Sequence, residues 1–207
     1  SIDALDTPSI IIDLSAMEAN IARLMERLAA SGKKVRPHLK TVKSPHLAQK
    51  LLGAGAKGCC VAKVSEAEVM AQAGISDLLI TSEVMGAVKI ERLLYLASSY
   101  PELKVVVDSA AGAKALHSAI SNMTEAIKLK VLLELNVGQN RAGVAPGGEA
   151  VDLAKYITSL ENLHLVGIQG YEGHLQHLAN DEKQRQCREA MKKLGDSAKS
   201  IRAAGIP

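Results

Sequence analysis

One feature constrains the fold of this 207-residue chain more than any other: short apolar runs alternate with segments of helical spacing. The runs are rich in β-branched residues and predict strands at 10–13, 35–40, 58–63, 77–81, 104–109, 128–136 and 163–171. The segments between them predict helices at 17–28, 44–54, 65–73, 86–99, 110–120, 147–159 and 181–204. This alternation indicates a parallel sheet with crossover helices, and the absence of a Pro- or Ser-rich linker predicts one domain.

Two α/β architectures have this order of elements: an open doubly wound sheet and a (β/α)8 barrel. A doubly wound sheet that binds a dinucleotide carries G-x-G-x-x-G after its first strand, and this chain has no such motif there. Functional groups of a barrel gather at the carboxyl ends of its strands. Polar residues stand at those ends in this chain: Lys40, Lys63, Ser82, Glu83, Asp108, 136–141 and 169–177. The barrel is therefore favoured, although seven predicted strands are fewer than the eight that close one.

The composition narrows the classes of function. The chain has no Trp or Phe and only four Tyr, so its core must be aliphatic and it offers few rings for stacking on bases. A net charge of +3 is too small to indicate nucleic acid as a partner. No apolar stretch approaches the roughly 18 residues of a membrane span, so we expect no membrane insertion. Three cysteines, two of them adjacent, make a poor disulfide framework and predict a reducing, cytoplasmic location.

Basic residues cluster in VRPHLKTVK, residues 35–43. Because side chains alternate along a strand, Arg36, His38 and Lys40 should share one face. Three basic groups that face a barrel mouth would attract an anionic ligand, such as a phosphorylated cofactor or a carboxylate. A lysine beside other cations loses its proton more readily, so Lys40 is suited to attack a carbonyl carbon. The alternative is a basic strand end that is paired with acidic side chains such as Glu134.

A second polar motif, ELNVGQNRAGV at 134–144, leaves a strand and enters a loop that contains glycine. Arg141 keeps its charge and has a planar fork of donors, so it suits a phenolate or carboxylate oxygen. The simpler alternative is a turn that Asn and Gly stabilise, with Arg141 in solvent.

The third motif is GIQGYEGHLQH at 167–177, in which Gln169 and Tyr171 share a strand face. His174 and His177 follow with the spacing H-x-x-H, which is weak evidence for a metal site, and we expect no metal ligand in this chain. A histidine that transfers a proton or contacts the substrate is the favoured alternative, and an exposed His174 is the simplest one.

Five stretches in order carry a family resemblance: TPSIIIDLSAMEANIARL, VRPHLKTVKSP, GAKGCCVAKVSEAEVMAQAGISDLLIT, VGQNRAGV and GIQGYEGHLQH. Together they resemble the fold-type III pyridoxal-phosphate enzymes, which are alanine racemase-like barrels. Within that group the chain is similar to the D-threonine aldolases and 3-hydroxyaspartate aldolases. The resemblance spans nearly the whole chain and implies a (β/α)8 barrel of the alanine racemase N-terminal type.

The resemblance implies a role for each matching residue. Lys40 would hold pyridoxal 5'-phosphate as a Schiff base, Arg141 would approach its phenolic oxygen, and Tyr171 would lie against its ring. Gln169 and His177 match residues near the substrate, and His38 matches a residue around the lysine. The catalytic residues implied in this way are Lys40, Tyr171 and His177, and the cofactor-binding residues are Lys40, His38, Arg141, Tyr171 and Gln169.

The implied activity is retro-aldol cleavage of a D-3-hydroxyamino acid, such as D-threonine, to glycine and an aldehyde. The cofactor would act as an electron sink that the protein orients. Two alternatives stay open: a β-elimination like that of D-serine dehydratases, and a protein that binds the cofactor without catalysis.

The resemblance also implies parts that this sequence lacks. In the family the ring begins at the lysine strand, so 10–13 would belong with a C-terminal β domain and about six ring strands would remain. We expect residues 1–207 to form part of a barrel whose last strands, glycine-rich phosphate loop and metal-carrying β domain are absent. The divalent metal would be manganese or similar, and the full-length protein would be a homodimer.

Overall fold

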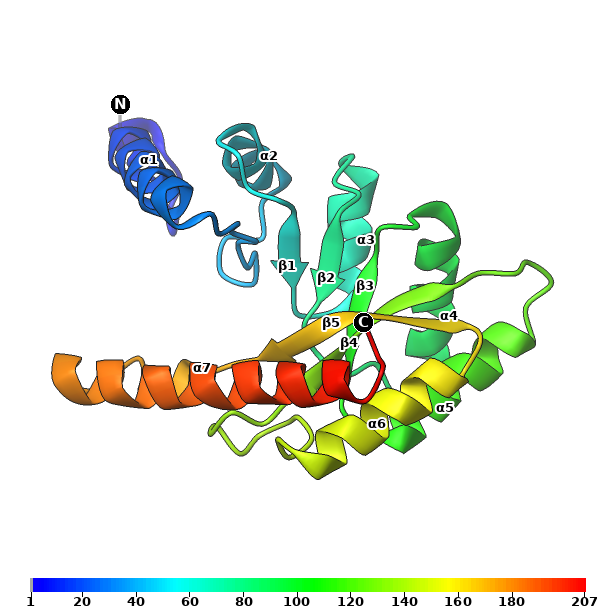
Figure 1. Ribbon diagram of the computed structural model, residues 1–207. Helices are drawn as coiled ribbons and strands as arrows, with labels where there is room; N and C mark the ends of the chain where they lie inside the picture. The colour runs from blue at the N-terminus through cyan, green and yellow to red at the C-terminus, as the bar shows by residue number, and fades with distance from the viewer. Residues whose placement is uncertain (1) are drawn as a thin grey trace.

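The computed structural model describes residues 2–207, and this part of the chain contains one parallel sheet in the order β1-β2-β3-β4-β5. Its strands are β1 (Cys59–Val61), β2 (Leu78–Ile80), β3 (Lys104–Val107), β4 (Leu129–Leu135) and β5 (Leu163–Gly170). Spatial order equals sequence order, whereas the order reverses in a doubly wound sheet. The barrel-type prediction is therefore confirmed, with a sheet that does not close on itself (Figure 1).

The helices are α1 (Leu14–Ser31), α2 (Pro45–Gly53), α3 (Val64–Gln72), α4 (Ala87–Ser99), α5 (Ala110–Ser121), α6 (Gly148–Ser159) and α7 (Asn180–Ala203), with short 3-10 turns at Ile2–Ala4 and Gly173–Leu175. From α3 to α7 each helix contacts the next, which places these helices on one side of the sheet, as in a barrel. Within the described residues, no helix has both the length and the apolar character needed to cross a membrane.

The core between the sheet and the helices is aliphatic, as the composition predicts. Val61, Leu78, Ile80, Val105 and Leu133 are each completely buried. Strands that are covered on both faces have nearly continuous apolar sequences, and β2 is buried at all three of its residues. The apolar residues inside the sheet therefore stabilise the strands, and the polar side chains lie at the strand ends.

The prediction of a strand at 10–13 is wrong. This segment is extended but forms no ladder, and Ile10 is 96% exposed. Its carboxyl end instead starts α1, because the Asp13 side chain accepts a hydrogen bond from the Ala16 amide at 2.9 Å. A strand needs a neighbouring edge to pair with, and none of the five strands lies beside this segment.

The predicted strand at 35–40 is reduced to a single bridge, between His38 and Cys60. Around it, the Cys60 amide donates to the Pro37 carbonyl, and the Leu39 amide donates to the Cys60 carbonyl, both at 2.8 Å. Pro37 has no N–H to add to the ladder, so regular pairing is interrupted there, although the Lys57 amide still donates to the Val35 carbonyl at 2.9 Å. The sheet consequently has five strands, and the segment that carries Lys40 lies along its edge, beside β1.

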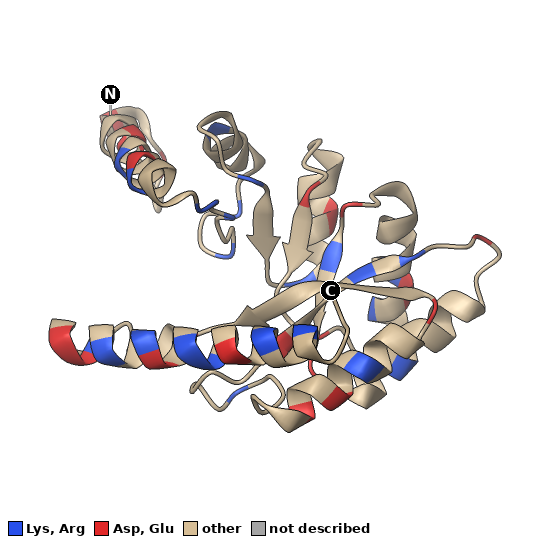
Figure 2. Cartoon of the chain, in the orientation of Figure 1, with Lys and Arg blue, Asp and Glu red and all other residues tan. Residues whose placement is uncertain are grey.

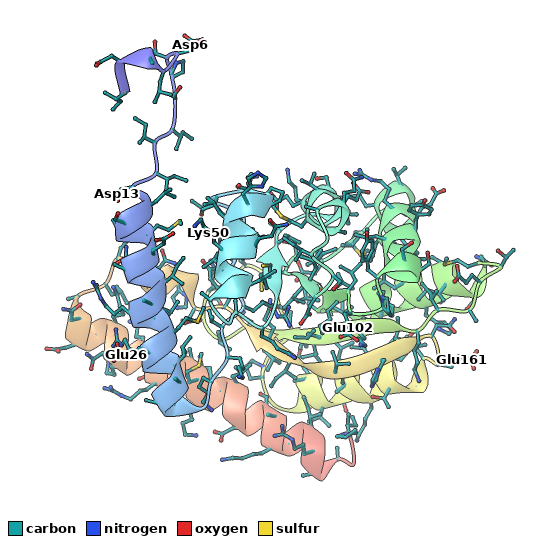
Figure 3. All side chains as sticks on the ribbon, turned by 90° about the horizontal axis from the view of Figure 1, so that it is seen from above. Asp6, Asp13, Glu26, Lys50, Glu102 and Glu161 are labelled. Carbon is teal, nitrogen blue, oxygen red and sulfur yellow. The ribbon has the colours of Figure 1, made fainter. Side chains whose placement is uncertain are left out.

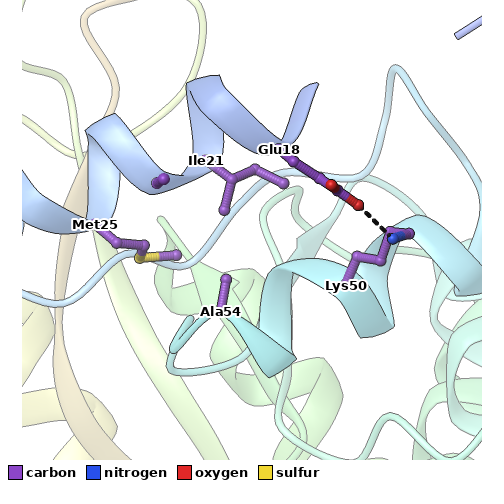
Figure 4. Close-up of a pocket in the computed structure, with 6 residues that line it drawn as sticks. Glu18, Ile21, Met25, Lys50 and Ala54 are labelled. Atoms are coloured by element: carbon purple, nitrogen blue, oxygen red, sulfur yellow. Dashed lines mark hydrogen bonds and ion pairs between the residues drawn. The ribbon is translucent and has the colours of Figure 1, made fainter. Parts of the chain in front are cut away.

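Helix α1 stands away from the sheet, next to α2 (Figures 1 and 3). The two helices are joined by an ion pair between Glu18 and Lys50 at 2.8 Å, and below it Ile21, Met25 and Ala54 line an open groove of about 370 Å³ (Figure 4). No residue of α1 is buried, so the groove contributes little packing.

Helix α7 is mostly exposed and carries basic and acidic residues in alternation along its length (Figure 2). Four exposed ion pairs link neighbouring turns, including Arg185 with Glu189 and Lys192 with Asp196. The helix predicted at 181–204 is thus confirmed, and exposed pairs of this kind add little stability.

Candidate functional site

A cavity of about 270 Å³ lies among the carboxyl ends of β1, β2, β4 and β5 and the 35–40 segment. Five of the six residues predicted as site residues line it: His38, Lys40, Arg141, Gln169 and Tyr171. The remaining lining residues are Arg36, Cys60, Thr81, Glu134 and Gly170. Residues from opposite ends of the sequence therefore meet in one place, because the carboxyl ends of parallel strands share an edge.

The Tyr171 ring lies near two cations of this cavity, Lys40 and Arg141. The Lys40 Nζ atom is 5.2 Å from the centre of the tyrosine ring, and the Arg141 guanidinium carbon is 5.5 Å from it. Both distances are within the range of a cation–π contact. Neither cation has an acidic partner among residues 2–207, and both side chains are exposed. The two charges are thus hydrated and remain available to an anionic ligand.

Arg36 has a structural partner, unlike Lys40. It donates two hydrogen bonds to the Asp77 carboxylate, at 2.8 and 3.0 Å, and a third to the Asp77 carbonyl at 3.0 Å. Lys104 also binds this carboxylate at 2.8 Å. The alternative of a paired basic segment therefore holds for Arg36, with Asp77 rather than Glu134 as the acid. The Arg36–Asp77 pair therefore helps to hold the 35–40 segment, which is joined to the sheet by only one β-bridge, between His38 and Cys60.

Both ring nitrogens of His38 are engaged. The Thr81 hydroxyl donates to the Val61 carbonyl at 3.2 Å, so it must accept the hydrogen bond from His38 Nε2 at 2.9 Å. His38 Nδ1 then accepts from the Lys40 amide at 3.1 Å, which defines a neutral ring protonated at Nε2. Burial, and next Lys40, lower the pKa of His38, in agreement with this form. His38 therefore supports the backbone that carries Lys40.

Glu134 is a site residue that sequence reasoning named only as a possible ion-pair partner. It is 6% exposed, and its Oε2 accepts a hydrogen bond from Gln169 Nε2 at 2.6 Å. Burial raises the pKa of Glu134 to about 7, the Gln169 hydrogen bond opposes this, and Glu83 adds to it. The signal was present as one acidic residue inside the apolar run LKVLLEL. A buried carboxyl group at a strand end is typical of a functional position.

Two further carboxyl groups, those of Glu83 and Asp108, interact electrostatically with Glu134 in the cavity wall. Burial raises the pKa of Glu83, and Asp108 adds to the rise while Arg141 opposes it. Asp108 also accepts a hydrogen bond from the Gly143 amide at 3.2 Å, which fixes the loop after β4. The same loop is a turn built on Asn136, as one alternative predicted, and its residue Arg141 still reaches the cavity.

Cys60 presents a thiol to the cavity. Burial raises its pKa to about 11, so the sulfur is protonated near neutral pH. A protonated, half-buried thiol is a poor nucleophile.

His177 is the predicted site residue that does not line the cavity. It is exposed after the 3-10 turn Gly173–Leu175, as is His174, and its catalytic role stays a prediction. Across residues 2–207, no group of three or more His, Cys, Asp and Glu side chains is placed to hold a metal ion.

Comparison with known proteins adds independent information. The model of the family "Alanine racemase, N-terminal domain" matches residues 12–207. D-threonine aldolase of an Arthrobacter species is 34% identical over 203 residues, which are 98% of this chain and 53% of that protein. D-threo-3-hydroxyaspartate dehydratase of a Delftia species is also 34% identical, over 98% of this chain and 53% of its own length. This chain therefore spans about half the length of these relatives.

Solved structures agree with the fold. The crystal structure of D-threonine aldolase from Filomicrobium marinum superimposes with a TM-score of 0.92 at 36% sequence identity, over 97% of this chain and 54% of that one. The family match, the identity to these relatives and the structural superposition lead to one conclusion. The chain belongs to the alanine racemase N-terminal domain family.

Proposed function

We propose that this chain is the cofactor-binding part of a pyridoxal-phosphate-dependent aldolase that cleaves a D-3-hydroxyamino acid, such as D-threonine, to glycine and an aldehyde. The observation that carries the proposal is the Lys40 amine. It faces a cavity beside an aromatic ring and a second cation, and no acidic side chain neutralises it.

The residues present fit this cofactor. A primary amine can bind an aldehyde covalently, the Tyr171 ring offers a flat apolar surface, and the Arg141 fork suits a phenolate oxygen. When bound, pyridoxal phosphate withdraws electrons from the α-carbon of an amino acid and so weakens the bonds to that carbon. The phosphate would need donors beyond the cations described here.

Six residues of the cavity have a defined task in this proposal. Lys40 provides the point of attachment, and His38 together with the Arg36–Asp77 pair holds the backbone that carries it. Tyr171 and Arg141 orient the ring, and Gln169 faces the substrate. Cleavage of the Cα–Cβ bond requires a base that takes the proton of the β-hydroxyl group, and a proton must then reach the α-carbon.

A β-elimination is the second candidate, because a dehydratase relative is as similar to this chain as the aldolase relative is. The two reactions differ in which bond breaks, and the same attachment lysine serves both. Assay of products from D-threonine separates them, since the aldolase yields glycine and acetaldehyde, whereas the dehydratase yields a 2-oxo acid and ammonia. A protein that carries the cofactor without catalysis would yield neither pair.

The cofactor assignment is tested with the full-length protein and a Lys40→Ala variant. The wild type should show the visible absorbance of lysine-linked cofactor, and the variant should lose it together with activity. Lys89→Ala is the matched control, because Lys89 is exposed on α4. Unchanged absorbance in Lys40→Ala would refute the assignment. A divalent metal, a homodimer and a C-terminal domain remain predictions of the family resemblance, for which intact mass and metal analysis of the full-length protein are the direct measurements.

A further inference from the structure

A β-bulge decides which residue lies opposite Glu134. Between β4 and β5, Val131 pairs with Leu165, but the next residue, Leu132, pairs with Gly167. The strand β5 thus contains one extra residue, and the register beyond it moves by one position. Glu134 then pairs with Gln169. Paired residues of neighbouring strands point to the same face, so the bulge places these two side chains together in the cavity wall.

The hydrogen bond between them fixes the amide of Gln169. An ionised carboxylate only accepts hydrogen bonds, so it must meet the amide nitrogen, as the 2.6 Å contact from Nε2 to Glu134 Oε2 does. The amide oxygen then has no hydrogen-bond partner among residues 2–207. Gln169 lines the cavity, and its oxygen is the atom that remains for a ligand.

From this arrangement we infer that Glu134 is a positioning residue, which holds Gln169 with its amide oxygen toward the cavity as an acceptor for a hydroxyl or ammonium group of the ligand. The assignment rests on the proposed function only in placing the ligand in this cavity. A β-hydroxyl group and an amine, both donors, are what a hydroxyamino acid would present.

The same pair responds to pH. A protonated Glu134 would donate a hydrogen bond to the amide oxygen of Gln169. The amide would then turn, so that its nitrogen, a donor, faces the cavity. The ligand would lose its acceptor. Because burial raises the pKa of Glu134 to about 7, this exchange falls near neutral pH. The charged and titratable groups around Glu134 are Glu83, Asp108, Arg141, Arg36, His38, Lys40, Cys60 and Tyr171.

The first test uses the full-length protein without cofactor and needs no activity. The side-chain amide signals of 15N-labelled Gln169, identified by their absence in Gln169→Leu, are followed by NMR from about pH 5.5 to 8.5. They should titrate in the wild type, lose this titration in Glu134→Gln, and keep it in the exposed control Glu161→Gln. An amide that does not respond to pH in the wild type would overturn the inference.

The second test measures the Michaelis constant for D-threonine against pH. In the wild type it should rise by up to about tenfold for each unit below the Glu134 transition, because only the ionised form presents the acceptor. The rise should vanish in Glu134→Gln and also in Gln169→Leu. If it persisted in Gln169→Leu, Glu134 would act directly and the positioning role would be refuted.

These outcomes separate the inference from the proposed function. Loss of the NMR titration in Glu134→Gln supports the positioning role whatever the reaction is. Visible absorbance that survives in Lys40→Ala would refute the cofactor assignment and leave the amide result intact.

Discussion

The ion pair under the 35–40 segment offers a quantitative test of the structure. Replacing Asp77 by Asn keeps the size of the side chain and removes its charge. The carboxylate accepts two hydrogen bonds from Arg36 and one from Lys104, and all three side chains are mostly buried, at 24%, 19% and 16% exposure for Asp77, Arg36 and Lys104. In the Asn variant an amide NH2 group would replace one carboxylate oxygen, so a donor would face a donor of Arg36 and one hydrogen bond would be lost.

The expected loss of unfolding free energy depends on the hydrogen bonds that Lys104 and Arg36 keep in the variant. Lys104 retains a carbonyl contact to Glu102 at 2.7 Å, and Arg36 retains the Asp77 carbonyl. The loss is therefore below the 3–5 kcal/mol of a fully buried broken pair, and we expect about 2 kcal/mol of unfolding free energy. Asp196→Asn is the matched control, because its pairs with Lys192 and Lys199 on α7 are exposed and their loss should leave the free energy of unfolding nearly unchanged.

Urea unfolding followed by circular dichroism measures this difference, since the chain has no Trp for fluorescence. Burial alone would raise the pKa of Asp77, but hydrogen bonds from Arg36 and Lys104 outweigh it and lower the pKa below 3.8. A carboxyl group with a depressed pKa stabilises the fold above its ordinary value, and this contribution is lost as pH falls through the folded value. The gap between wild type and variant should therefore shrink in acid. Equal stability at pH 7, or a gap independent of pH, would refute the reasoning.

Two further predictions concern the loop and the histidine near Lys40. Gly143→Ala should cost at least about 2 kcal/mol of unfolding free energy, because φ is +94° and a Cβ would lie 2.5 Å from the backbone of Asn136. The control Gly147→Ala has a similar φ of +98° but open space around the added Cβ, so it should cost about 1 kcal/mol. Equal costs for the two variants would contradict the steric argument. His38→Gln should flatten the loss of stability as pH falls below 6.5, since burial lowers the pKa of His38 and the folded state resists its protonation. Paired urea titrations at about pH 7.5 and 5.5 measure this difference, and an identical pH dependence in the variant would count against a neutral ring.

Sequence patterns predicted the parts of the fold that depend on alternation. The sheet, its parallel connections and the meeting of polar strand ends follow from the order of elements, because parallel strands end at a common edge. The same patterns overestimated pairing at 10–13 and 35–40. Apolar β-branched residues favour an extended backbone, but a ladder also needs a partner edge and an N–H group, which Pro37 lacks.

The spacing of apolar residues could not predict the Glu134–Gln169 pair, because the pair depends on the bulge in β5. An unbroken ladder from Val131 would have placed Glu134 opposite Ile168, and a buried carboxyl group beside an apolar side chain would lack a donor. Gln169 and His164 are the polar residues of β5, and His164 lies at the opposite end of the strand. The extra residue, Val166, is 39% exposed, so the bulge does not insert it into the core. The change of register thus gives the buried carboxyl group a donor, which the alternation of apolar and polar residues does not encode.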